Sequence, residues 1–255
     1  MTKIYITIIS VITVIAVLFG CFIHIFNRGN YSWSFSRNNV FSNATSNSVE
    51  LSGDVDSIEV DVDFGGITIA YGDDVHVEYT LPENYIPEIE LKNGTLSVKQ
   101  KNSVRIGGDG WGDYSILIVI PAETELDKLD VNLDAGNIEI ADIPCKDFTV
   151  KCNAGNIELD KIESESMSVN VDAGNIELAD CSADKVSVKA DAGNIELDRC
   201  TIDEFYADAD AGNIDADNCT INSGEVKTDI GNISLNGDIG NVKTHTSIGL
   251  IDSDN

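Results

Sequence analysis

DAGNIEI, which begins at Asp134, returns with small changes at a fixed interval along the second half of the chain. The later copies are NAGNIEL from Asn153, DAGNIEL from Asp172 and from Asp191, DAGNIDA from Asp210, and DIGNISL from Asp229. Successive copies start 19 residues apart, and a degenerate seventh copy, SIGLIDS from Ser247, places its glycine one residue early. A fixed period near 20 residues is typical of a solenoid, in which each repeat is one coil that packs on its neighbours.

One repeat, Val169 to Ser187, shows how such a coil would fold. Apolar and polar residues alternate up to Ala173, which is the period of a strand with one buried face. Gly174-Asn175 interrupts the alternation. From Ile176 on, the apolar residues stand at even-numbered positions where they were odd-numbered before, so this pair must turn the chain to keep them inward. We therefore expect two short strands and a less regular third side in each coil. The predicted fold class is all-β: a single-stranded parallel β-solenoid with 19-residue coils, preceded by one transmembrane helix.

Stacking the coils in register produces columns of like residues about 4.8 Å apart. One inward column is isoleucine throughout: Ile138, Ile157, Ile176, Ile195, Ile214 and Ile233. One outward column is acidic: Glu139, Glu158, Glu177, Glu196 and Asp215. We interpret the acidic column as a solvated face, and loose collection of divalent cations is the alternative.

The six cysteines do not follow the spacing of a disulfide framework or of a zinc site. Cys181, Cys200 and Cys219 continue an inward column that begins with Ile143 and Ile162. We therefore predict that they are buried, reduced core residues. A disulfide between neighbouring coils and a thiolate metal site are the alternatives.

The net charge of −28, from 44 acidic against 16 basic side chains, limits the partners of the protein. It argues against nucleic acid, whose phosphates need Lys and Arg, and against a surface that lies flat on anionic lipid.

The first 28 residues contain an uninterrupted apolar run, Ile4 to Phe26, which is long enough to span a bilayer. We expect residues 1–28 to form an uncleaved anchor with the rest of the chain outside the cell. A lipoprotein signal that ends at Cys21 and a cleaved signal peptide are the alternatives.

Three further regions follow the anchor. Residues 29–48 are rich in Asn and Ser and are expected to be a flexible spacer, and residues 129–255 hold the regular repeats. Residues 49–128 form an irregular β region that we expect to cap the solenoid, because an open strand edge needs covering. Within it, the stretch from Asp63 to Ile67 matches the repeat pattern, and Asn93-Gly94 predicts a hairpin turn.

A glycine-rich loop from Arg105 to Tyr114 is the candidate ligand-contact segment, through Asp109, Trp111 and Asp113. An exposed indole offers binding area, although a simple hairpin connection with the indole folded on the cap is the plainer interpretation. The sequence contains no hydrolase, phosphate-loop or zinc-protease motif, so we expect no catalytic residue, no metal and no cofactor.

The apolar leader, the polar spacer, SIEVDVDFGGITI from Ser57 and the DAGNIEL coils together resemble a bacterial family of uncharacterised β-strand-repeat proteins described as adhesins. The resemblance covers Val49 to Asp252 and implies a β-solenoid at the cell envelope. The sequence thus favours a membrane-anchored, non-catalytic surface module for envelope interaction or adhesion. Its expected partners are the membrane and a glycan or envelope protein. A carbohydrate-active enzyme on a β-helix and a spacer or sensor partner of another envelope protein are the alternatives.

Overall fold

The computed structural model describes residues 44–100, 114–122 and 124–253, all within one compact unit that spans Phe41–Asn255. The expected anchor at 1–28, the spacer up to residue 43, and the loop with Asp109, Trp111 and Asp113 lie outside the described residues. Within the described ranges, no helix is both long and apolar enough to cross a membrane.

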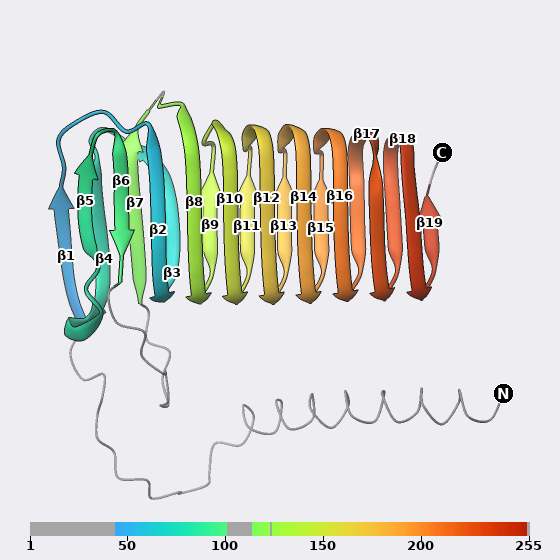
Figure 1. Ribbon diagram of the computed structural model, residues 1–255, viewed down its shortest axis with the longest axis horizontal. Helices are drawn as coiled ribbons and strands as arrows, with labels where there is room; N and C mark the ends of the chain where they lie inside the picture. The colour runs from blue at the N-terminus through green and yellow to red at the C-terminus, as the bar shows by residue number, and fades with distance from the viewer. Residues whose placement is uncertain (1–43, 101–113, 123, 254–255) are drawn as a thin grey trace, which may run out of the picture. The chain divides into compact units, whose positions relative to one another are not determined.

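The described residues form an all-β parallel solenoid of about seven turns (Figure 1). The irregular end consists of β1 (Ala44–Glu50), β2 (Ser57–Phe64), β3 (Gly66–Gly72), β4 (His76–Pro82), the 3-10 helix η1 (Glu83–Tyr85), β5 (Glu88–Lys92), β6 (Thr95–Lys99) and β7 (Ser115–Pro121). The regular coils consist of β8 (Leu126–Ala135), β9 (Ile138–Ala141), β10 (Cys145–Ala154), β11 (Ile157–Asp160), β12 (Glu163–Ala173), β13 (Ile176–Ala179), β14 (Ser182–Ala192), β15 (Ile195–Asp198), β16 (Thr201–Ala211), β17 (Ile214–Ile230), β18 (Ile233–Ile248) and β19 (Ile251–Ser253).

From β8 to β16 each coil is one long strand and one short strand joined by the Gly-Asn pair, whereas β17 and β18 each run through both segments without a break. β12 lies between β10 and β14 in a parallel ladder, where Val169 pairs with Val150 and Val188, each 19 residues away. The 19-residue coil is therefore confirmed. The expectation of a less regular third side is wrong, because Glu163 and Ser164 already pair with the next coil as the first part of the long strand. Extending the ladder in this way gives these backbone groups hydrogen-bond partners.

The side chains that point inward form one continuous hydrophobic core. Every residue of the isoleucine column, Ile138, Ile157, Ile176, Ile195, Ile214 and Ile233, is at most 1% exposed. Complete burial of such a side chain contributes roughly 1.5–3 kcal/mol before the entropy of ordering is subtracted. The core therefore outweighs the mutual repulsion of surface carboxylates.

The Gly-Asn turns stack as tightly as backbones allow. Gly174 has a φ of 152°, and a Cβ on it would lie 1.8 Å from the carbonyl oxygen of Gly155. The Oδ1 of Asn156 accepts a hydrogen bond of 2.9 Å from the backbone N–H of Asn175. The same contact repeats along the column from Asn137 to Asn232. The asparagine side chains thus accept hydrogen bonds from the backbone of the next coil.

The turn at the other end of each short strand is made by a residue in the left-handed conformation. These residues, with φ from 52° to 61°, form what we call the left-handed corner: Asp142, Lys161, Asp180, Arg199 and Asn218. The inward column of Ile143, Ile162, Cys181, Cys200 and Cys219 follows directly, one residue later. A short strand ends directly before the corner at Asp142, Lys161, Asp180 and Arg199, whereas β17 runs continuously through Asn218.

The irregular end contains the additional coil expected from the sequence. Phe64 of β2 pairs with Ala135, and Ile67 of β3 pairs with Ile138, both in parallel. The hairpin at Asn93-Gly94 joins β5 to β6, and both turn residues have positive φ. Beyond this coil, β4 runs antiparallel to β7 and to β1.

Strand β1 begins inside the stretch that the sequence analysis expected to be a flexible spacer. Residues 44–48, which we had assigned to the flexible spacer, lie in β1 and pair along β4 from Ala44–Pro82 to Glu50–His76. Their Ser and Asn side chains carry no strand signal, but the free edge of β4 supplies a hydrogen-bonding partner for the backbone.

Candidate functional site

The outer face of the short strands carries the acidic row, by which we mean Glu139, Glu158, Glu177, Glu196 and Asp215. The four glutamates are exposed and Asp215 is half-buried. Each member lies beside the next in the parallel ladder, so the carboxylates follow the strand spacing of about 4.8 Å. At this separation two unit charges repel by about 0.9 kcal/mol in water before screening by salt.

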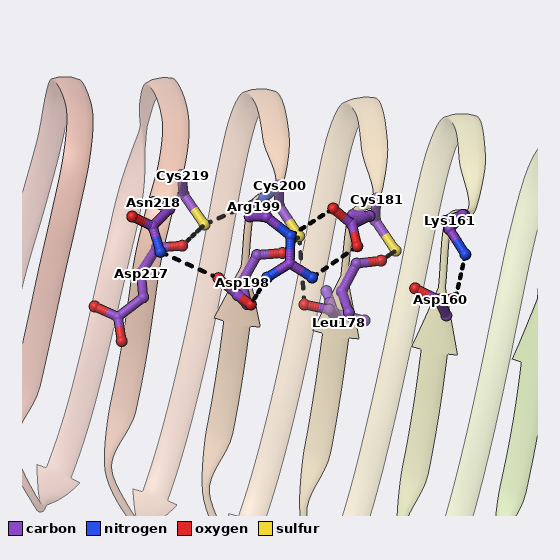
Figure 2. A network of polar contacts seen from close by, with 12 residues as sticks. Asp160, Lys161, Leu178, Cys181, Asp198, Arg199, Cys200, Asp217, Asn218 and Cys219 are labelled. Carbon is purple, nitrogen blue, oxygen red and sulfur yellow. Dashed lines mark hydrogen bonds and ion pairs between the residues drawn. The ribbon is translucent and has the colours of Figure 1, made fainter.

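A second row runs alongside on the same face, two residues further along each short strand. It alternates small and acidic side chains before ending in two acids: Ala141, Asp160, Ala179, Asp198 and Asp217. Its acids lie next to the left-handed corner, as Figure 2 shows.

The corner side chains neutralise part of this second row. Lys161 Nζ lies 2.9 Å from an oxygen of Asp160 and 3.8 Å from one of Asp142. Arg199 bonds Asp198 through Nη1 and forms a two-point ion pair with Asp180. The hydrogen bond from Arg199 is the main reason that the pKa of Asp180 is lowered.

The acidic row, in contrast, has no such neutralisation. Across the ranges that the structure describes, the carboxylates of Glu139, Glu158, Glu177, Glu196 and Asp215 take part in no ion pair and no side-chain hydrogen bond. Burial and then the charge of Asp217 raise the pKa of Asp215. The row is therefore a line of free hydrogen-bond acceptors at regular spacing.

The cysteine column lies directly behind the left-handed corner (Figure 2). Cys181, Cys200 and Cys219 have exposures of 2%, 1% and 1%, which confirms that they are buried, and none of the three forms a disulfide. The backbone N–H of Cys200 donates to Sγ of Cys219 at 3.4 Å. A hydrogen bond with Cys181, together with burial, raises the pKa of Cys200 to about 12. These thiols act as small core residues.

A shallow groove of about 440 Å³ lies on the irregular end, where β1, β4 and β7 meet. Its lining is mainly hydroxyl groups with one amide, one carboxylate and one apolar side chain, and the residues are Ser46, Asn47, Ser48, Glu78, Tyr79, Thr80, Ser115 and Leu117. Ser46 and Thr80 share a hydrogen bond of 2.9 Å across it. The groove offers polar contacts but no grouped acid, base and nucleophile.

Asp109, Trp111 and Asp113, the ligand-contact residues predicted from the sequence, lie outside the residues that the structure describes. Among the residues that are described, no three His, Cys, Asp or Glu side chains converge on a position for a metal ion. The sequence analysis did not predict the ion pairs between the side chains of the left-handed corner. Their signal was present as alternating charge, Asp142, Lys161, Asp180, Arg199, at a spacing of 19 residues.

The coils, the unpaired acidic row and the buried thiols define a parallel β-solenoid with a repeated exposed surface. The chain belongs to the Toastrack DUF4097 family, whose sequence pattern matches residues 55–249. Among curated proteins, no match to the chain is found.

The chain is similar to proteins of known structure. A candidate adhesin from Bacteroides fragilis NCTC 9343 is 15% identical with a TM-score of 0.60, and the similarity covers 84% of this chain and 98% of that one. A protein from Parabacteroides distasonis ATCC 8503, described as a candidate lipid-binding protein, is 18% identical with a TM-score of 0.38, and covers 84% of this chain and 98% of its own. At such identities the first likeness establishes the solenoid fold alone.

Proposed function

We propose that the protein is a membrane-anchored, non-catalytic surface module that adheres to other envelope or cell-surface components through the outer face of its short strands. The observation that carries the proposal is the acidic row, in which carboxylates stand in register without partners among the described residues. A rigid row of acceptors fits a repeating partner that presents ammonium or hydroxyl groups, and a glycan is the first class to test. The description of the Bacteroides fragilis structure as an adhesin supports an adhesive role.

The repetition of the face favours adhesion over catalysis. A catalytic pair needs two carboxyls in different environments, whereas the four glutamates of the row occupy equivalent positions in successive coils. Many equivalent weak contacts instead gain strength through multivalency.

The proposal is tested by binding of fragment 41–255, which retains β1, to a panel of bacterial glycans and to isolated membranes. Glu158→Gln, Glu177→Gln and Glu196→Gln together should weaken binding about tenfold or more. The matched control is Asp172→Asn, Asp191→Asn and Asp210→Asn. It removes the same number of charges at the same coil spacing from the long strands β12, β14 and β16, and it should leave binding nearly unchanged.

Three outcomes would count against the proposal. Equal weakening by both variants would show that only net charge matters. Release of products from a polysaccharide would favour the carbohydrate-active enzyme. Specific capture of one envelope protein, unaffected by the glutamine substitutions, would favour the spacer or sensor partner.

The proposed location of the protein in the cell rests on the apolar run Ile4 to Phe26. We propose a single-pass protein of the bacterial cell membrane with the β unit outside. Protease added to intact cells should remove the repeats and leave a small membrane fragment. Protected repeats would overturn the orientation, and a mature N-terminus at Cys21 would replace the helix by a lipid anchor.

A further inference from the structure

The groove on the irregular end is continuous with the acidic row. Glu78 of β4 pairs with Leu117 of β7, which pairs in turn with Thr68 of β3. Thr68 pairs on its other side with Glu139, the first member of the row. Residues that pair across neighbouring strands have their side chains on the same face of a sheet. The groove and the acidic row therefore share one outer face, and Glu78 stands three strand spacings, or about 14 Å, beyond Glu139.

The groove differs from the row in the groups that it offers. Hydroxyls line it on three neighbouring strands, because Ser46, Thr80 and Ser115 occupy paired positions in β1, β4 and β7. Beside them lie the carboxylate of Glu78 and the half-buried side chain of Leu117. An apolar side chain flanked by hydroxyl and carboxylate groups suits a sugar ring, which has an apolar C–H face and a rim of hydroxyls.

The volume and the charge of the groove limit the ligand further. Its volume of about 440 Å³ lies within the range of small-molecule sites. Among the described residues that line it, none is a lysine or an arginine, and the charged contact of Glu78 is His76 Nε2 at 3.7 Å. A carboxylate next to an acidic row repels uronic and other acidic sugars, whereas it accepts hydrogen bonds from hydroxyl or ammonium groups.

The position of the groove gives the outer face a direction. The carboxylates of the row, such as Glu158 and Glu177, occupy equivalent positions, so a repeating ligand could bind along them in more than one register. The groove interrupts this repetition at the irregular end, where the antiparallel strands β1 and β4 replace the coils (Figure 1). A chain whose end is bound there extends along the row in one orientation.

We propose that the groove is a terminal sugar-binding site, which takes the last one or two units of a glycan whose further units lie along the acidic row. The ligand is a neutral or amino-substituted sugar, bound through hydrogen bonds to Glu78 and the groove hydroxyls, with its apolar face on Leu117. The part that concerns the further units rests on the proposed function, because it takes the row as the adhesive surface. The groove itself binds a disaccharide without the row.

The test uses the full-length chain in a detergent without a sugar head group, so that the detergent does not compete for the groove. Dissociation constants are measured by NMR titration for diglucosamine, di-N-acetylglucosamine and digalacturonate, and for the six-unit oligomers of the first two sugars. We expect the amino and the neutral disaccharide to bind, and digalacturonate to bind about tenfold more weakly or not at all. The six-unit oligomers should bind more tightly than the disaccharides, because they also reach the row.

Variants separate the groove from the row. Glu78→Gln should weaken binding of the disaccharides and of the six-unit oligomers about tenfold, because an amide is a weaker acceptor than a carboxylate. Glu90→Gln, at an exposed carboxylate of β5 outside the groove, is the matched control and should change neither. The triple variant Glu158→Gln, Glu177→Gln and Glu196→Gln should weaken binding of the six-unit oligomers alone. Circular dichroism checks that each variant is folded, as we expect for isosteric changes at exposed positions.

Three results would overturn the groove site. They are the absence of binding by both the amino and the neutral disaccharide, equal or tighter binding of digalacturonate, and equal disaccharide binding by the Glu78→Gln and Glu90→Gln variants. The proposed function fails by a different result. If the triple variant binds the six-unit oligomers as the native chain does while Glu78→Gln weakens them, the groove is a sugar site and the row is not the adhesive surface.

Discussion

Arg199 and Asp180 form a two-point ion pair between neighbouring coils, with Nε 2.7 Å from Oδ1 and Nη2 2.7 Å from Oδ2. Both residues have left-handed backbone conformations, with φ of 55° and 52°. Lys161 and Asp142 repeat the pairing of opposite charges two coils earlier. The left-handed corner thus places a cation beside an anion at successive coils, on an otherwise acidic solenoid.

The first prediction concerns this alternation. Arg199→Glu should lower the melting temperature by a few degrees, because it places a third carboxylate beside Asp180 and Asp198. Thermal unfolding measures the change, and added sodium chloride should reduce it. Arg199→Asn is the control, since Asn218 holds the same corner one coil later. Equal melting temperatures for the two variants would show that the corner charges do not matter.

The second prediction concerns the stacked glycines. Gly174→Ala should cost about 3 kcal/mol or more, because its Cβ would lie 1.8 Å from the backbone oxygen of Gly155. Gly66→Ala is the matched control, since the nearest atom to a Cβ there is 3.8 Å away. Chemical denaturation measures both. A small loss in Gly174→Ala would mean that the coils separate more easily than the stacked turns indicate.

The sequence was sufficient to predict the coil but not the interactions that its turns make with neighbouring coils. Gly174 and Ile176 were sufficient to predict a turn and a change of parity, because hydrophobic period and glycine are local signals. The contact between Asn156 and Asn175, 19 residues apart, depends on the stacking distance and could not be read from either residue alone. The strand at Ala44–Glu50 was missed for a related reason, since its pairing with β4 and not its composition fixes it.

The candidate site was predictable to a similar degree. The column from Glu139 to Asp215 follows from the period. That these carboxylates are unpaired, while Asp160 and Asp198 bond Lys161 and Arg199, required the side-chain positions.

The third prediction concerns alkaline pH. Burial raises the pKa of Cys152 from 9.0 to about 11. The unfolded chain therefore loses this proton first, so the stability due to the neutral thiol is complete below pH 9 and is lost as the pH rises toward 11. Cys152→Val, which matches Val171 in the next coil, should reduce the loss by about 1 kcal/mol near pH 10. Identical pH profiles for the variant and the native chain, measured by denaturation, would contradict this.

The last prediction concerns removal of a whole coil, because a surface built by repetition should keep its adhesion when one repeat is lost. Deleting 188–206 joins Ser187 to Ala207, which is the ladder partner of Val188, and brings Asp180 beside Asn218. Deleting 169–187 should be tolerated less well, since it brings Lys161 beside Arg199. Deleting only 169–177 cuts a coil in the middle and should prevent folding.

The most direct measurement is binding of the 188–206 deletion variant to the glycan or membrane that the native chain captures. We expect a folded protein that binds the same target more weakly, because one carboxylate of the acidic row, Glu196, has been removed while the remaining members stay in register. A folded variant that has lost all binding would contradict it, because binding would then depend on a single site within that coil.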